Sequence, residues 1–146
     1  MVKRKTALIA YCGVYCADCP AYTQSIANTA GNLHQELKRN KLGKTAPALA
    51  KIPAFKAFKH YQKFSDLLGT MMKMVCKKPC RMGGGSPDCQ IRKCVKDKGL
   101  VGCWQCDNFP TCKLLEDLGD FDKTYLKNLR KIKRQGPAAF VKSKNS

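Results

Sequence analysis

Ten cysteines in 146 residues constrain this chain more than any other feature, because thiols at such short spacings need a common role. They are Cys12, Cys16, Cys19, Cys76, Cys80, Cys89, Cys94, Cys103, Cys106 and Cys112. Three roles are available, namely disulfides, zinc ligation and iron–sulfur ligation. The first needs an oxidising compartment, which a protein reaches through a secretory signal.

The N-terminus has some features of such a signal, since the basic residues 3–5 precede the apolar run 7–10. That run is shorter than the roughly 7–15 apolar residues of a signal peptide, and no small-residue cleavage site follows it. No later segment approaches the ~20 apolar residues that span a bilayer. We therefore expect a soluble, cytoplasmic protein with reduced thiols and no membrane partner.

The segment 76–112 holds seven of the cysteines and is rich in glycine, proline and polar residues. A stretch such as 79–87 has too little apolar surface to offset the entropy that it loses when it becomes ordered. In small zinc modules, metal–thiolate bonds supply that free energy directly. The composition therefore predicts a metal-bound layer.

Two stretches before this segment have the periodicity of α-helices. Asp18 or Cys19 can cap a helix with Pro20 in its first turn, which continues to Gly43 with apolar positions at Tyr22, Ile26, Ala30, Leu33 and Leu37. A second helix opens at Pro53. Its broad apolar arc, which we interpret as core, consists of Phe58, Tyr61, Phe64, Leu68, Met71 and Met72. Another, narrow side of this helix carries Lys56, Lys59 and Lys63.

A third helix is predicted from Asp122 to Gly136-Pro137, with Tyr125, Leu129 and Ile132 along one side. Strand patterns are weak and are confined to residues 8–11 and 100–104, which would pair beside the cysteines. We therefore predict a mostly α fold in one small domain, 1–146. Its helices pack on an irregular cysteine-rich metal-binding layer with at most two short strands, and a basic C-terminal helix and tail occupy about 122–146.

The spacing of the cysteines suits tetrahedral zinc, because the turn in a Cys-x2-Cys pair brings two sulfurs to one side of the ion. The pairs 16–19 and 103–106 have this spacing, and the looser pair 89–94 fits one helical turn or a knuckle. Ten thiols complete two four-cysteine sites and leave two over, which could be structural, form a redox pair or replace ligands during exchange. The sequence does not decide which cysteines share a metal. His34 and His60 lie in predicted helices, and we expect them at the surface or in the core.

Iron–sulfur ligation is the alternative to about two zinc ions. Cys12-x3-Cys16-x2-Cys19 has the spacing with which radical S-adenosylmethionine enzymes hold a four-iron cluster, but those enzymes carry it in a β/α barrel that this chain is too short to form. A cluster without catalysis stays open, since Cys19-Pro20 resembles the pair that closes ferredoxin runs. A thioredoxin-like role is disfavoured, because no βαβ unit surrounds these cysteines.

Four segments have a distinctive order: CGVYCADCPAY at 12–22, CQIRKCVKDKG at 89–99, CWQCDNFPTCKL at 103–114 and NLRKIKRQG at 128–136. Together they resemble a cysteine-rich prokaryotic family called domain of unknown function 3795, over nearly the whole chain. The resemblance implies metal binding by analogy, while the family has no established activity and its frequency in anaerobes keeps iron–sulfur ligation open. Members typically have Cys-x-Gly-Cys before the glycine loop. Here the pair Cys76 and Cys80 encloses one more residue, with Pro79 in place of glycine, so Cys76 is the weakest ligand candidate.

The chain is strongly basic, with 28 Lys or Arg, 10 Asp or Glu and a net charge of +18. Two four-thiolate zinc sites would lower this charge only to +14, because eight thiolates add −8 and two zinc ions add +4. Arg81, Arg92 and Lys93 adjoin cysteines in the sequence or lie close to them. We expect these three cations to stabilise anionic metal–thiolate centres.

The C-terminal segment carries a further basic excess, since residues 123–146 contain eight Lys or Arg and no acid. Opposite its apolar side, the predicted helix carries Lys127, Arg130, Lys131 and Arg134. Such a stripe suits phosphate backbones and favours structured RNA or a ribonucleoprotein as partner. A solvated, solubilising face and an acidic protein partner are the alternatives. No base-reading motif is visible, so binding should be directed at the backbone.

Two functions follow from these patterns. The favoured one is a zinc-stapled basic binding module that engages RNA, a ribonucleoprotein or another polyanion. The alternative is an iron–sulfur protein for electron transfer or metalloenzyme maturation. The sequence contains no phosphate loop, no paired acidic dyad and no metal site with an evident open position, so we predict no catalytic residues.

Overall fold

The computed structural model describes residues 5–118 and 124–144, and the chain divides into two compact units. Residues 1–23 and 76–146 form the first, which we call the cysteine unit because it contains all ten cysteines. Residues 24–75 form the second, which we call the insert because it separates the two parts of the cysteine unit in sequence. The predicted single domain thus consists of two compact units. Among the described residues, no helix combines the length and apolar character that a bilayer span requires.

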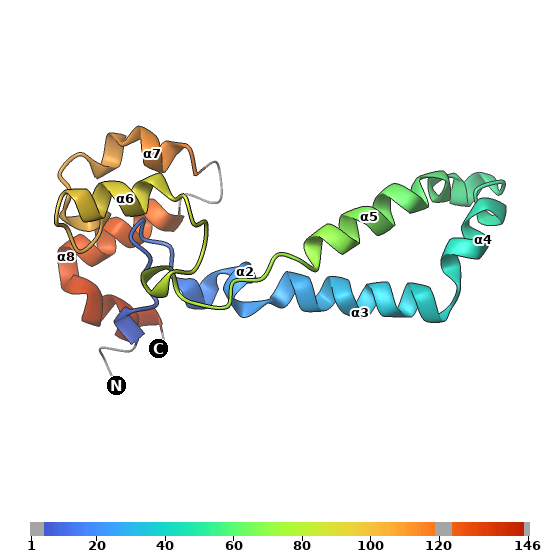
Figure 1. Ribbon diagram of the computed structural model, residues 1–146, viewed down its shortest axis with the longest axis horizontal. Coiled ribbons are helices and arrows are strands. Elements are labelled where there is room, and N and C mark those ends of the chain that lie inside the picture. Colours follow the sequence, from blue (N-terminus) through green and yellow to red (C-terminus); the bar gives the residue numbers. More distant parts are fainter. Residues whose placement is uncertain (1–4, 119–123, 145–146) are drawn as a thin grey trace. The chain divides into compact units, whose positions relative to one another are not determined.

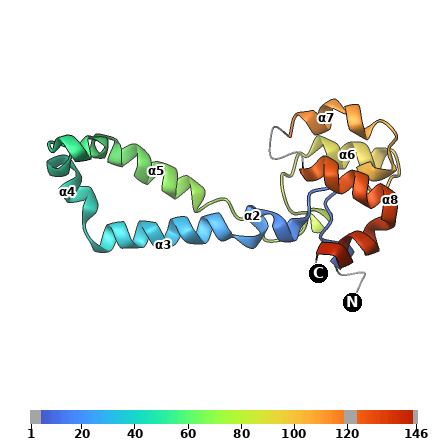
Figure 2. The same ribbon diagram turned by 180° about the vertical axis from the view of Figure 1, so that it is seen from behind.

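Four helical elements form the insert: α3 (Ser25–Arg39), α4 (Leu42–Leu49), the 3₁₀ segment η2 (Pro53–His60) and α5 (Tyr61–Met71). Figure 1 shows α3 and α5 side by side and running in opposite directions, with α4 in the connection between them. The view from behind in Figure 2 shows the same pairing. Pro53 opens a helical segment as predicted, but the chain becomes α-helical only at Tyr61.

The predicted helix from Pro20 to Gly43 is divided at two residues. Gln24 and Lys41 have left-handed φ angles of 58° and 53°, which residues other than glycine seldom adopt and which interrupt a helix. Pro20 therefore opens only the short α2 (Pro20–Thr23), which belongs to the cysteine unit. Gly43 lies inside α4, so the predicted stop at this glycine is wrong. Hydrophobic periodicity misses such breaks because it continues across a single interrupting residue.

The insert buries few large side chains. Ala27, Ala30, Ala46 and Leu68 are buried in it. By contrast, Ile26, Leu33, Phe64 and Met72 are 38%, 42%, 41% and 38% exposed. The interpretation of the second helix's apolar arc as core is therefore wrong at Phe64 and Met72. Two helices that lie side by side cover only the flank that each turns toward the other, and a broad apolar arc extends beyond this flank.

The cysteine unit is a set of short helical elements joined by loops. After α2 they are η3 (Cys80–Met82), α6 (Gln90–Asp97), η4 (Cys103–Gln105), η5 (Phe109–Thr111), α7 (Lys113–Glu116) and α8 (Thr124–Lys144), while η1 (Cys16–Asp18) precedes α2. The predicted mostly α fold is confirmed.

The segments 8–11 and 100–104 do not pair as strands, and the described part of the chain contains none. They meet instead through one hydrogen bond, in which the Cys103 N–H donates to the Tyr11 carbonyl at 2.9 Å. The first segment turns back on itself, so that Ile9 and Tyr15 form an isolated antiparallel bridge. This tight turn uses the hydrogen-bonding groups that a longer ladder would need.

Helix α8 extends further toward the C-terminus than the sequence predicts. Its predicted start at Asp122 lies outside the described residues. Gly136, with φ 82° and ψ 161°, interrupts the helix as predicted, but Pro137 opens a further helical stretch that continues to Lys144. The predicted tail is therefore mostly helix, and Phe140 and Val141 in it are buried.

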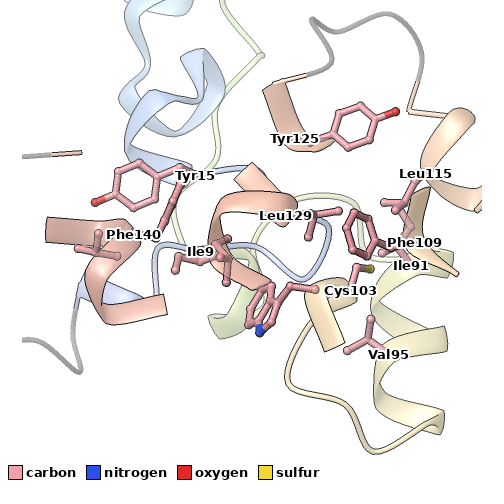
Figure 3. Close-up of a cluster of buried hydrophobic side chains, with 13 residues drawn as sticks. Ile9, Tyr15, Ile91, Val95, Cys103, Phe109, Leu115, Tyr125, Leu129 and Phe140 are labelled. Atoms are coloured by element: carbon pink, nitrogen blue, oxygen red, sulfur yellow. The ribbon is translucent and has the colours of Figure 1, made fainter. Parts of the chain in front are cut away.

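The core of the cysteine unit joins the two parts of its sequence. Figure 3 shows Ile9 and Tyr15 beside Leu129 and Phe140 of α8, and the rings of Tyr15 and Phe140 meet edge to face with centroids 5.8 Å apart. The same cluster also contains Ile91, Val95, Cys103, Trp104, Phe109 and Leu115. The turns that carry cysteines are therefore attached to a common apolar core.

Candidate metal centre

Two single 3₁₀ turns present the Cys-x2-Cys pairs. In η1 and in η4, the N–H of the second cysteine donates to the carbonyl of the first at 3.0 Å. The second cysteines, Cys19 and Cys106, leave their turns with nearly the same backbone angles, φ −81° and ψ 120° against φ −82° and ψ 129°. Both pairs therefore have one local geometry, of the kind that places two sulfurs on one side of a metal.

The loop between Cys76 and Cys80 approaches the glycine run that follows it. The Gly85 N–H donates to the Cys76 sulfur at 3.2 Å, and the Cys76 thiol donates to the Lys78 carbonyl at 3.0 Å. Gly84 lies so close to this carbonyl that a Cβ atom would overlap it. Glycine thus lets the backbone come near the sulfur and donate to it, which stabilises a thiolate.

Cys16 has three thiols as neighbours. Burial raises its pKa, and the thiols of Cys80, Cys19 and Cys76 also raise it because nearby negative charges disfavour a thiolate. A hydrogen bond with the Cys80 backbone acts in the opposite direction and lowers this pKa. Cys16 therefore lies near Cys76 and Cys80 as well as near Cys19. We call these four cysteines the first set, and Cys76, the weakest candidate by sequence, belongs to it.

Cys103 has a different group of neighbours. Burial raises its pKa to about 12, and the thiols of Cys12, Cys112, Cys94 and Cys106 contribute to the rise. Figure 3 shows its side chain near Ile91, Val95 and Phe109 in the core. Helix α6 carries Cys94, and Cys112 immediately precedes α7. We call Cys94, Cys103, Cys106 and Cys112 the second set.

Cys12 and Cys89 belong to neither set and are neighbours of one another. Burial raises the pKa of Cys12 to about 11, a hydrogen bond with the Val14 backbone lowers it, and the thiols of Cys80 and Cys89 add smaller increases. Cys12 is also a neighbour of Cys103. Of the thiols that raise the pKa of Cys103, Cys12 has the largest effect, so Cys12 lies near the second set as well as near Cys80 of the first.

The sets are groups of neighbours and not closed cages. In residues 5–118 and 124–144, no three Cys, His, Asp or Glu side chains are close enough together to hold a metal ion as they stand. All ten cysteines are free thiols. His34 and His60 lie in the insert, in helical elements as expected.

Arg81 is fixed in place beside the cysteines. Its Nε donates to the buried Ile9 carbonyl at 2.6 Å, and its Nη2 donates to the Val101 carbonyl at 2.8 Å. The guanidinium lies 4.5 Å from the ring centroid of Tyr11 and 5.3 Å from that of Trp104. Each of these aromatic residues adjoins a cysteine in sequence. A permanent cation is therefore held between the loop at Cys12 and the turn at Cys103.

A second arginine contacts the first set directly. The Nη2 of Arg92 donates to the Gly84 carbonyl and lies 3.7 Å from the sulfur of Cys80. Its Nε is buried and has no hydrogen-bond partner in the described part of the chain. Such a buried donor is costly unless negative charge lies nearby, and thiolates would provide that charge. Two of the three cations expected beside the cysteines thus occupy such places, whereas Lys93 is exposed.

Helix α8 fastens the loop that begins at Cys12. Its Asn128 is buried, and the Nδ2 of this residue donates to the Gly13 carbonyl at 2.9 Å. Gly13 has a φ of 88°, and a Cβ atom there would lie 2.6 Å from Cγ of Leu129. The predicted docking side of Tyr125, Leu129 and Ile132 is buried, as expected. The role of Asn128 was missed, although a polar residue within an apolar helix face is a recognisable signal.

The opposite side of α8 carries the predicted basic stripe. Lys127, Arg130 and Arg134 are exposed, and Lys131 is half-buried. Lys133 differs from these four, because its Nζ lies 2.9 Å from a carboxylate oxygen of Asp107. The helix thus has one docked face and one basic, accessible face.

Comparison with known families matches residues 8–117 to the family described as "Protein of unknown function (DUF3795)". The matched region contains every cysteine and covers the insert, while α8 lies beyond it. No curated protein and no solved structure matches the chain.

Proposed function

This chain belongs to the DUF3795 family of proteins of unknown function, and we propose that it is a zinc-stapled basic module that engages RNA, a ribonucleoprotein or another polyanion. The arrangement of α8 is the observation that carries this proposal. One face of the helix docks on the cysteine-bearing loops, and the other presents Lys127, Arg130 and Arg134 to solvent. In this proposal the metal-bound cysteines stabilise the fold, and α8 binds the polyanion.

The donor sets support zinc as the staple. The first set offers four thiols from two short segments and the second offers four from three, and four thiolates are a common structural zinc site. The backbone N–H of Gly85 at the Cys76 sulfur and the guanidinium of Arg92 near the Cys80 sulfur would stabilise the thiolate form of the first set. Metal binding is expected to draw the four sulfurs of a set together, since ligation and folding are coupled in small thiolate modules. Bound zinc would supply structural stabilisation only.

The basic stripe supports a polyanion as partner. Each phosphate that a Lys or Arg neutralises releases counterions, so a stripe of accessible cations binds a phosphate backbone with a strong dependence on salt. The basic side chains on one face of α8 can contact successive phosphates of an RNA backbone without contacting the bases. Binding should therefore be similar across unrelated structured RNAs.

The test compares RNA binding by the parent and by a variant in which Lys127, Arg130, Lys131 and Arg134 become glutamine. Over a salt series, the slope of log affinity against log salt should fall by roughly one unit for each phosphate contact that is lost. A matched control replaces four exposed lysines of the insert with glutamine, which removes the same charge: Lys38, Lys44, Lys51 and Lys73.

The expected result is weaker binding and a lower slope for the α8 variant, with the control near the parent. Metal content is measured on all three proteins, so that loss of the metal layer is distinguished from loss of the stripe. Equal affinities and slopes for the parent and the α8 variant would show that the stripe is a solvated face. Equal losses in both variants would show a response to net charge alone.

A further inference from the structure

An apolar groove runs along the insert between α3 and α5. Its first part is lined by Ile26 and Leu33 of α3 with Leu68 and Met71 of α5. A second hollow shares Leu33 with the first and continues along the same two helices toward η2, where Leu37, Phe58 and Phe64 line it. The two hollows therefore form one groove in the insert, along the pair of helices that Figure 1 shows side by side.

The groove leaves apolar surface without cover. Leu33, at its centre, is 42% exposed, Phe64 is 41% exposed and Ile26 is 38% exposed. An amphipathic helix is stable when its apolar stripe packs against another element, and two antiparallel helices leave room for a third between their outer flanks. The groove therefore has the form of a helix-binding site.

The dimensions of the groove suit a short helix. Its lining residues on α3 run from Ser25 to Leu37. At a rise of 1.5 Å per residue this distance is roughly 18 Å, which corresponds to a helix of about three turns. A partner helix with apolar residues at i, i+3, i+4 and i+7 would place them along this length.

The charge of the insert determines the chemistry of the occupant. Residues 24–75 contain nine Lys or Arg and two acids. Both acids have partners, since Glu36 pairs with Arg39 at 2.5 Å and Asp66 accepts from Gln62 at 2.9 Å. A hollow that shares Leu37 and Tyr61 with the groove is lined by three exposed lysines, Lys38, Lys41 and Lys44. A partner therefore needs apolar residues on one side and carboxylates beside them.

Other occupants fit this surface less well. A second copy of the chain would bring the same basic excess against this one, and like charges oppose such contact. RNA offers phosphates to the lysines but no aliphatic surface for Ile26, Leu33 and Leu68. An acidic amphipathic helix offers apolar residues to the groove and carboxylates to the lysines.

We propose that the groove between α3 and α5 binds an acidic amphipathic helix of a partner protein. The apolar face of that helix lies against Leu33 and its neighbours, and its carboxylates face Lys38, Lys41 and Lys44. This site is separate from the basic stripe of α8, so it goes beyond the proposed function and does not depend on it.

The test uses the full-length, metal-loaded protein and a fluorescent 14-residue peptide built from leucine and glutamate, with leucine at i, i+3, i+4 and i+7. Its partner probe has lysine in place of every glutamate. Fluorescence anisotropy is expected to show at least tenfold tighter binding of the glutamate peptide. Leu33→Gln should weaken that binding at least tenfold, because Leu33 belongs to both hollows. Met74→Gln is the matched control, since Met74 is 43% exposed and lies outside the groove.

Hydrogen exchange of the parent protein locates the peptide without any substitution. Protection on α3 and α5 is the expected result, whereas protection confined to α8 would overturn the proposal in favour of simple charge attraction. Equal binding of the two peptides would also overturn it. Self-association of the parent protein that Leu33→Gln abolishes would overturn the proposal as well, because it would identify a second copy as the occupant. Loss of binding to phosphatidylglycerol vesicles in this variant would instead identify a lipid surface.

Discussion

Replacing Arg81 with methionine should destabilise the cysteine unit by about 3 kcal/mol. Methionine keeps the apolar length of the side chain and removes the guanidinium, so the change isolates the polar and ring contacts. The polar contacts are the hydrogen bonds to the carbonyls of Ile9 and Val101. The ring contacts are with Tyr11 and Trp104, whose ring centroids lie 4.5 and 5.3 Å from the guanidinium.

The magnitude follows from the burial of each partner. Ile9 is fully buried, and its carbonyl left without a donor costs about 2 kcal/mol. Water can replace the arginine at the Val101 carbonyl, because that bond is exposed, so its loss costs about 0.5 kcal/mol. The contacts with Tyr11 and Trp104 contribute about 0.5 kcal/mol or more in total after methionine has restored part of the packing. A loss of about 3 kcal/mol lowers the ratio of folded to unfolded protein roughly 150-fold.

Urea unfolding with zinc in slight excess measures this loss, and the fluorescence of the chain's one tryptophan, Trp104, reports on the cysteine unit. Arg130→Met is the matched control, since Arg130 is exposed on α8 and its loss should change the free energy of unfolding by less than about 0.5 kcal/mol. Metal content is determined for both variants. If Arg81→Met cost less than about 1 kcal/mol with full metal content, the Ile9 carbonyl would have found another donor and the argument from burial would be refuted.

Three further predictions concern the metal, the grouping of its ligands and the loop that α8 fastens. Protein purified anaerobically should be colourless with close to two zinc ions per chain, whereas stoichiometric iron with absorption near ~400 nm would identify an iron–sulfur protein. Cys76→Ser and Cys94→Ser should each lower the zinc content by one ion and Cys89→Ser by none, so a loss of zinc in Cys89→Ser would contradict the two sets. Gly13→Ala should lower the free energy of unfolding by at least about 2 kcal/mol, because φ is 88° and a Cβ would lie 2.6 Å from Cγ of Leu129. An unchanged urea midpoint would show that the loop can move away from α8.

Local patterns predicted the parts of this protein that depend on neighbouring residues in the chain. The docking side of α8 was correct at Tyr125, Leu129 and Ile132, because helical spacing determines which residues share a face. The interruption at Gly136 was correct because glycine is the residue that adopts a positive φ without strain. The likeness of the two Cys-x2-Cys turns also follows from their spacing alone.

The same patterns could not show whether a face would be covered. Ile26, Leu33 and Phe64 have the periodicity of core residues, yet α4 and η2 leave them exposed. Phe140 gave the opposite error, since the segment after Gly136 looks like a basic tail, yet the Phe140 side chain is fully buried and packs against Tyr15. Burial depends on what packs against a residue, and periodicity has no information about that element.

Sequence by itself determined that this is a mostly helical, cysteine-rich, strongly basic chain, because composition and spacing are local properties. Tertiary structure alone decided how the thiols are grouped, with Cys76 beside Cys16 and Cys112 beside Cys103. It also decided that Asn128 holds the carbonyl of Gly13, a contact between residues 115 positions apart. Many pairings of ten cysteines satisfy the same spacings, and the choice among them is made by the apolar core, which brings the two distant parts of the cysteine unit together.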